Sequence, residues 1–149
     1  MLMTQQIAKF FTLALLISAL PSIGFSADNM PNWAGQSVLS AQTSRGLSIK
    51  LDSELQPLEI NKIHSWLIHL SDENGKAVSD ATIEFSGGMP EHNHGLPTQP
   101  QVTRELEPGV YLLEGLRFHM QGAWRLDLKI NWNKQGSAIA DGVIINFDL

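Results

Sequence analysis

Two short segments of the chain concentrate the side chains that could ligate a metal ion. The first, residues 87–95, reads GGMPEHNHG, and the second, residues 116–124, reads LRFHMQGAW. Together they hold three of the five histidines and two of the five methionines. Thioether sulfur suits Cu(I), and imidazole suits Cu(I), Cu(II) or zinc, so this mixture of donors favours copper. The candidate ligands are Met89, His92, His94, His119 and Met120.

In the first segment, spacing decides which side chains could share an ion. His92 and His94 are two residues apart, so they project to the same side if the segment is extended. Met89 can join them only if Pro90 turns the chain, and the neighbouring glycines permit such a turn. Glu91 is a possible hard ligand, but a glutamate in a polar loop usually faces solvent.

In the second segment, His119 and Met120 are adjacent, so on a regular strand they point to opposite faces. Either one of them belongs to the core, or a bulge near Gly122 brings both around to the ion. A loop histidine alone is usually solvated, and a methionine beside Phe118 is usually packing. The joint pattern, M-x-x-H-x-H followed by H-M, nevertheless favours a metal site.

The remaining histidines are interpreted as structural or solvated. His69 falls on the polar face of an expected strand, and His64 precedes Trp66 near the start of that strand. Neither is expected to contribute to the site.

Period-two alternation predicts the scaffold that positions these segments. Apolar and polar residues alternate at 47–52, 66–70, 81–85, 124–130 and 143–147. Such runs indicate half-buried strands, and Asn74-Gly75 between two of them predicts a hairpin. Seven or eight short antiparallel strands predict an all-β, immunoglobulin-like β-sandwich from about residue 38 to 149. Its core is expected to include Trp66, Phe85, Leu126 and Ile145.

The start of one expected strand adds a second indication of this fold. The stretch PGVY at residues 108–111 is similar to a tyrosine corner, in which a phenol hydroxyl ties a loop across the end of a sandwich.

The N-terminal residues have the pattern of an export signal. Lys9 precedes the apolar run FFTLALLISAL, and small residues follow at Gly24 and Ser26. We expect a secretory signal peptide at 1–26, so the mature chain begins at Ala27. The alternative is an uncleaved anchor, which so short an apolar run disfavours. Residues 27–36 are expected to be a flexible lead-in, and 37–149 a single domain.

Charge and composition narrow the partners. Losing Lys9 changes the formal net charge from −5 to −6, so nucleic acid is not an expected partner. No later segment has the apolar length of a membrane span. The chain has no cysteine, which removes disulfides, lipid-anchored cysteine, thiolate zinc sites and cysteine nucleophiles. A periplasmic or other extracytoplasmic location is expected.

Two longer stretches carry a family resemblance. GGMPEHNHGLPTQP and PGVYLLEGLRFHMQGAWRLDLKI contain M-P-x-H-x-H-G-x-P, G-x-Y and F-x-M-x-G-x-W. Over roughly residues 48–130 the chain resembles the YtkA-like domain family, which is related in pattern to FixH-type domains. This chain lacks the membrane-anchored layout of FixH proper. The resemblance implies an extracytoplasmic immunoglobulin-like sandwich, and relatives are associated with copper handling and cytochrome oxidase assembly.

The resemblance also assigns positions. The motif positions that it implies for a metal site are Met89, His92, His94 and Met120, with His119 beside the last. Phe118, Gly122 and Trp124 match positions that look architectural.

Two functions follow from these observations. The first is an exported copper-binding protein, a carrier or metallochaperone that passes Cu(I) or Cu(II) to an acceptor protein in oxidase assembly. The second is a metal-free interaction module that docks through the proline-rich loop and an exposed Trp33 or Trp132. An enzyme is not expected, because the sequence has no nucleophile elbow, carboxylate-pair motif or phosphate-binding glycine loop. His92, His94 and His119 could form an open zinc site, but the methionines favour copper.

Overall fold

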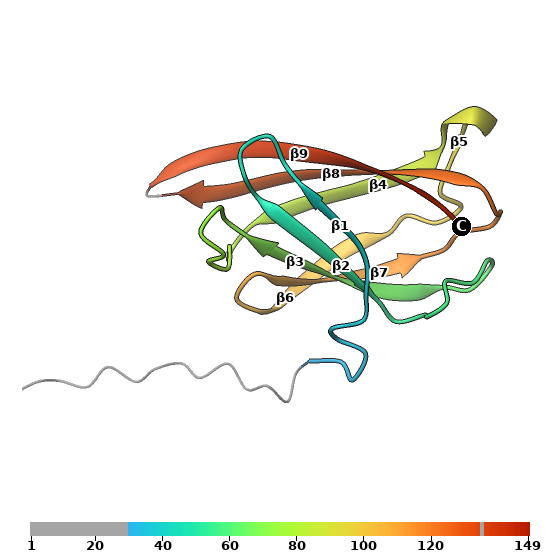
Figure 1. The fold of residues 1–149 in the computed structure, drawn as a ribbon, viewed down its shortest axis with the longest axis horizontal. Helices are drawn as coiled ribbons and strands as arrows, with labels where there is room; N and C mark the ends of the chain where they lie inside the picture. Colours follow the sequence, from blue (N-terminus) through green and yellow to red (C-terminus); the bar gives the residue numbers. More distant parts are fainter. Residues whose placement is uncertain (1–29, 135) are drawn as a thin grey trace, which may run out of the picture.

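The computed structural model describes residues 30–134 and 136–149. The predicted signal peptide and the beginning of the predicted lead-in lie outside these residues. The described chain forms nine strands in two antiparallel sheets that face each other (Figure 1). The predicted all-β sandwich is therefore confirmed.

The two sheets differ in size. In spatial order, the five-stranded sheet contains β1 (Ser37–Gln42), β2 (Ser48–Ser53), β3 (His64–Ser71), β7 (Val110–Leu116) and β6 (Gln101–Glu107). The four-stranded sheet contains β5 (His94–Gly95), β4 (Thr82–Met89), β8 (Ala123–Lys134) and β9 (Ser137–Asp148). A single-turn 3-10 helix, η2 (Pro90–His92), lies between β4 and β5.

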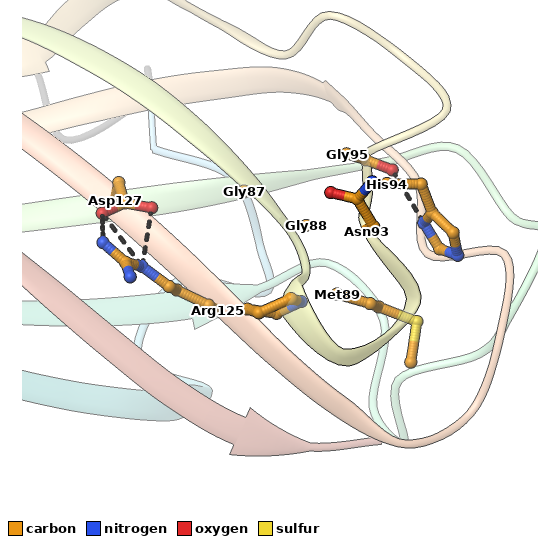
Figure 2. Close-up of a pocket in the computed structure, with 9 residues that line it drawn as sticks. Gly87, Gly88, Met89, Asn93, His94, Gly95, Arg125 and Asp127 are labelled. Carbon is orange, nitrogen blue, oxygen red and sulfur yellow. Dashed lines mark hydrogen bonds and ion pairs between the residues drawn. The ribbon is translucent and has the colours of Figure 1, made fainter.

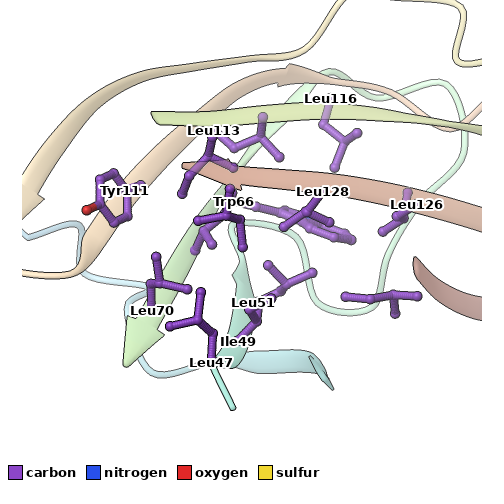
Figure 3. Packing of buried hydrophobic residues seen from close by; sticks show 14 of the residues in the cluster. Leu47, Ile49, Leu51, Trp66, Leu70, Tyr111, Leu113, Leu116, Leu126 and Leu128 are labelled. Atoms are coloured by element: carbon purple, nitrogen blue, oxygen red, sulfur yellow. The ribbon is translucent and has the colours of Figure 1, made fainter. Parts of the chain in front are cut away.

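The core lies between the sheets because alternate residues of each strand point inward. Trp66 of β3 is 0% exposed and packs with Leu126 and Leu128 of the opposite sheet (Figure 3). Ile145 is also buried. Phe85 packs against this core as predicted, but it is only partly buried. Phe85 is on the inner face of β4, but the short β5 pairs only with Gly88 and Met89, so the edge of β4 beside Phe85 has no neighbouring strand among the described residues.

The predicted turn at Asn74-Gly75 is present, but it does not join neighbouring strands of one sheet. Asp72 donates its backbone N–H to Lys76 (2.8 Å), and Ser71 bridges Ala77. The chain then passes to the other sheet, where β4 pairs with β8 rather than with β3. The local turn therefore forms without the predicted hairpin.

The predicted tyrosine corner fixes this connection. The Tyr111 hydroxyl donates to the Val78 carbonyl (2.6 Å) and accepts from the Ala81 N–H (3.0 Å). The preceding turn needs Gly109, which has φ of +77°. A Cβ there would lie 2.6 Å from the Leu70 carbonyl oxygen. Tyr111 thus ties residues 78–81 to β7.

Three connections carry the chain between the sheets, at residues 72–81, 96–100 and 117–122. The latter two lie at the same end of the sandwich, near the C-terminus (Figure 1). One directly follows the first ligand-rich segment, and the other lies within the second. The fold therefore brings the two segments to one end.

The described part of the predicted lead-in packs on the outer face of the five-stranded sheet. Trp33 contacts the cluster formed by Leu67, Val110 and Leu112. Gly35 donates its N–H to the carboxylate of Asp52 (2.5 Å), which is 0% exposed. In the described ranges, no helix has the length and apolarity that crossing a membrane requires.

Candidate metal centre

The first segment forms the end of a narrow hairpin. β4 ends at Met89, η2 turns the chain, and β5 pairs back so that His94 lies opposite Met89. Asn93 has φ of +53°, a left-handed conformation that asparagine tolerates and that reverses the chain. The spacing prediction assumed an extended segment between His92 and His94. This assumption is wrong, because the chain turns at Asn93. The two rings nevertheless face each other, with centroids 5.7 Å apart and planes 24° apart.

The second segment is a loop rather than a continuous strand. Residues 117–122 join β7 to β8, so the opposite-face rule for His119 and Met120 does not apply. The loop is braced by a bond from the Asn61 N–H to the Phe118 carbonyl (2.6 Å). At its far end Gly122 and Leu149 exchange two backbone bonds of 2.9 and 3.1 Å.

Three histidines from the two segments form one cluster. The centroids of His94 and His119 lie 4.7 Å apart, with their planes at 49°. His94 is thus the central ring, between His92 and His119. Two imidazoles on one tetrahedral ion, bonded at about 2.0–2.1 Å, have centroids roughly 5 Å apart. The separations fit a shared ion, but the nearly parallel rings of His92 and His94 must turn for their nitrogens to converge.

The two candidate thioethers have different environments. Met89 is 1% exposed and belongs to the main core, with its Cε against Gly122. Because it lies opposite His94 in the hairpin, its side chain lies on the same side as that ring (Figure 2). Met120 is 37% exposed. One thioether therefore lies below the histidine cluster, and the other is in an exposed loop beside it.

Sequence reasoning missed the burial of Met89, although a signal was available. Residues 83, 85, 87 and 89 continue the inward register of β4, so Met89 falls on the core face. The proline and glycines around it suggested a loop and hid that register.

The environment of His119 favours the neutral form of its imidazole. Partial removal from water lowers the pKa of this imidazole, and the proximity of His94 and Arg117 lowers it further. Its Nδ1 is buried and has no hydrogen-bond partner among the described residues. His94 Nδ1 lies 3.4 Å from the Gly95 carbonyl oxygen. Neutral imidazole is the form that binds metals.

The residues present fit copper in donor type. The buried, unpartnered nitrogen of His119 adjoins a second imidazole, and a thioether lies beneath them. These are the borderline and soft donors that copper accepts. No set of three His, Asp or Glu side chains in the described ranges is already arranged around a common point. The site therefore requires side-chain rotation to close on an ion.

The other polar candidates lie outside the cluster. His64 is 3% exposed in the core, where its Nδ1–H donates to the Lys62 carbonyl (3.1 Å). His69 Nε2 bonds Asp52 (2.7 Å) on the outer face of the five-stranded sheet. Glu91 is exposed on η2. A structural interpretation of the two histidines agrees with these positions.

A cavity of about 350 Å³ adjoins the hairpin (Figure 2). Met89 and His94 line one side, and the opposite side is formed by Arg125 and Asp127, which are bonded to each other at 2.9 Å. Hydrogen bonding to Asp127 raises the pKa of Arg125. Arg125 and Asp127 thus bond each other, and no hydrogen bond between either of them and the histidine cluster is present among the described residues.

The sequence did not predict that Trp124 contacts the histidine cluster, because Trp124 was interpreted as an architectural residue. Its ring meets that of His119 edge-on, with centroids 5.6 Å apart and planes at 81°. Its Nε1–H donates to the Met120 carbonyl (3.1 Å). The short spacing between His119-Met120 and Trp124 in FHMQGAW could have indicated this contact.

The fold and cluster define a class: a two-sheet β-sandwich protein with histidine and methionine side chains gathered at one end. Within that class, the chain belongs to the YtkA-like family, whose sequence profile matches residues 41–129. No curated protein matches the chain.

One of the solved structures that match this chain illustrates the shared fold. It is the "as isolated" form of FetP from uropathogenic E. coli strain F11, expressed recombinantly in the periplasm of E. coli BL21(DE3). The match has a TM-score of 0.50 and 9% sequence identity, and it covers 78% of this chain and 97% of that chain. At this identity the similarity concerns the fold alone.

Proposed function

We propose that this protein binds one copper ion at the cluster of His92, His94 and His119, with Met89 or Met120 supplying a thioether, and acts as an exported copper carrier. The observation that carries the proposal is the contact between His94 and His119, whose centroids lie 4.7 Å apart across two separate connections. The unpartnered Nδ1 of His119 supports it, since a buried nitrogen without a partner is available to a ligand.

The export pattern expected at residues 1–26 supports the proposed cellular role. Such a chain would hold copper in the periplasm or a comparable compartment and pass it to an acceptor, such as a protein in oxidase assembly. That FetP was produced in the periplasm agrees with this location. The proposal is for binding and delivery rather than catalysis.

Copper content and affinity test this proposal. Wild-type protein purified from the periplasm should contain one copper per chain and compete for Cu(I) against a chromophoric chelator. The double variant His92→Ala, His94→Ala should lose stoichiometric binding while keeping its thermal stability, because His92 is exposed and His94 is half-buried.

The matched control is His69→Gln, which removes a half-exposed imidazole on another face but keeps a donor for Asp52. It should bind copper as the wild type does. Unchanged affinity in the double variant would refute the site. Binding should also weaken below about pH 6.5, where imidazoles become protonated.

The metal-free docking function has less support. It relied on exposed tryptophans, but Trp132 is 8% exposed, and Trp33 is partly buried against the outer face of the five-stranded sheet. Neither offers a free indole surface to a partner.

A further inference from the structure

Trp124 connects the histidine cluster to the hydrophobic core. Its side chain is 1% exposed, and its ring lies between those of Phe118 and His119. The Phe118 and Trp124 centroids are 5.0 Å apart, with planes at 67°. On the strand, Trp124 of β8 pairs with Phe147 of β9. The indole is therefore held by packing on one side while its other side contacts a candidate ligand.

The same indole also shapes the loop that carries that ligand. Residues 117–122 lie between β7 and β8 and do not pair with any strand of the described structure. Backbone bonds brace this loop near Phe118 and at Gly122, and between them the Trp124 Nε1–H holds the Met120 carbonyl at 3.1 Å. The bonds at Phe118 and Gly122 join backbone atoms, whereas the bond to Met120 is donated by the Trp124 side chain. A single residue thus contacts the ring of His119 and fixes the backbone of Met120.

We propose that Trp124 is the positioning residue of the copper centre. It does not ligate the ion: its ring contact limits the orientations of the His119 imidazole, and its N–H keeps the loop in the shape that faces His94. This inference rests on the proposed copper function. Partners that orient metal ligands typically change metal affinity by about 10–100-fold when they are removed.

The chain offers a matched pair of substitutions for the test. Trp124→Phe keeps an aromatic ring and removes the N–H that holds Met120. Trp66→Phe makes the same chemical change at a side chain that is 0% exposed and whose Nε1 has no partner in the described structure. The Trp66 ring contacts His64 and Phe118 rather than the histidine cluster. Both variants therefore lose core volume, but only one loses the contact with the site.

Two measurements separate positioning from stability. Cu(I) affinity by chelator competition should fall about 10–100-fold in Trp124→Phe and change less than about twofold in Trp66→Phe. The Cu(II) electron paramagnetic resonance spectrum reports ligand geometry, and only Trp124→Phe should shift its hyperfine splitting. Thermal melting of the metal-free proteins establishes that the two variants are comparably folded.

Wild-type affinity and an unchanged spectrum in Trp124→Phe would overturn this inference while leaving the copper function intact. Failure of the wild-type protein to bind copper would overturn both. If Trp124→Phe does not fold, 15N-labelled wild-type protein supplies the test. On Cu(I) addition the indole N–H resonance of Trp124 should shift while that of Trp66 does not, and an unmoved Trp124 resonance would overturn the inference.

Discussion

Replacing Tyr111 with phenylalanine should destabilise the sandwich by an amount that the tyrosine corner lets us estimate. The substitution keeps the ring and deletes the hydroxyl, so the Val78 carbonyl loses a donor at 2.6 Å and the Ala81 N–H loses an acceptor at 3.0 Å. Each bond contributes about 1 kcal/mol, and leaving a buried group unpaired adds more, for a total of about 2–4 kcal/mol. For a domain of this size, that corresponds to a melting temperature lower by roughly 10 °C.

The alkaline side of the stability curve gives an independent measurement. Burial raises the pKa of Tyr111 to about 12, whereas an unfolded tyrosine ionises near about 10. The unfolded state therefore loses its proton first as pH rises. The contribution of Tyr111 to stability is complete below pH 10 and is lost as pH rises towards 12.

Urea unfolding at neutral and alkaline pH, for wild type and Tyr111→Phe, measures both effects. Tyr111 is the chain's single tyrosine, so the absorbance change on phenol ionisation reports this hydroxyl alone. Titration near pH 10 in the folded protein would refute the effect of burial on this hydroxyl, and a variant within about 0.5 kcal/mol of wild type would refute the assigned bonds.

Two further predictions concern the core and a turn. Burial lowers the pKa of His64, so the unfolded chain takes up a proton first and stability falls as pH drops below about 6.5. Unfolding at pH 7 and 5 should show a smaller loss in His64→Phe, and equal losses would contradict the assignment. Gly109→Ala and Gly75→Ala share positive φ values of 77° and 76°, but an added Cβ meets Leu70 only at Gly109. Denaturant midpoints should therefore show Gly109→Ala as clearly the less stable variant, and equal midpoints would refute the predicted clash.

Local alternation predicted β2, β3, β4, β8 and β9, in which inward side chains alternate with more exposed ones, but it did not identify β1 or β6, where no residue is fully buried. Trp66 and Leu126 are buried as their position in the period-two pattern requires. The partner of each strand was harder to predict. Asn74-Gly75 encodes a turn within a few residues, whereas the passage of the chain to the other sheet depends on packing between distant strands. The turn residues therefore predicted the turn itself but not the sheet that the following strand joins.

The candidate site was predicted as a set of residues rather than as a geometry. The pairing of His92 with His94 was expected, but an αL residue and a short hairpin bring the rings together rather than an extended chain. The contact between His94 and His119 depends on two connections meeting at one end of the sandwich, which no short-range pattern encodes. Met89 was expected in a polar loop, yet its side chain reaches the core.

The position of the two connections has a mechanical consequence. At the opposite end of the sandwich, polar contacts such as those of Ser44 and Arg45 with Asp141 join the sheets, whereas between the sheets the contacts are mainly apolar packing, which resists sliding less than a bond does. His94 adjoins the connection at 96–100, and His119 lies on the connection at 117–122. An ion bound by both His94 and His119 would crosslink the two connections that join the sheets at this end. Pulling the sheets apart from that end should then require more force with metal than without it, and proteases should cut the loaded loops more slowly.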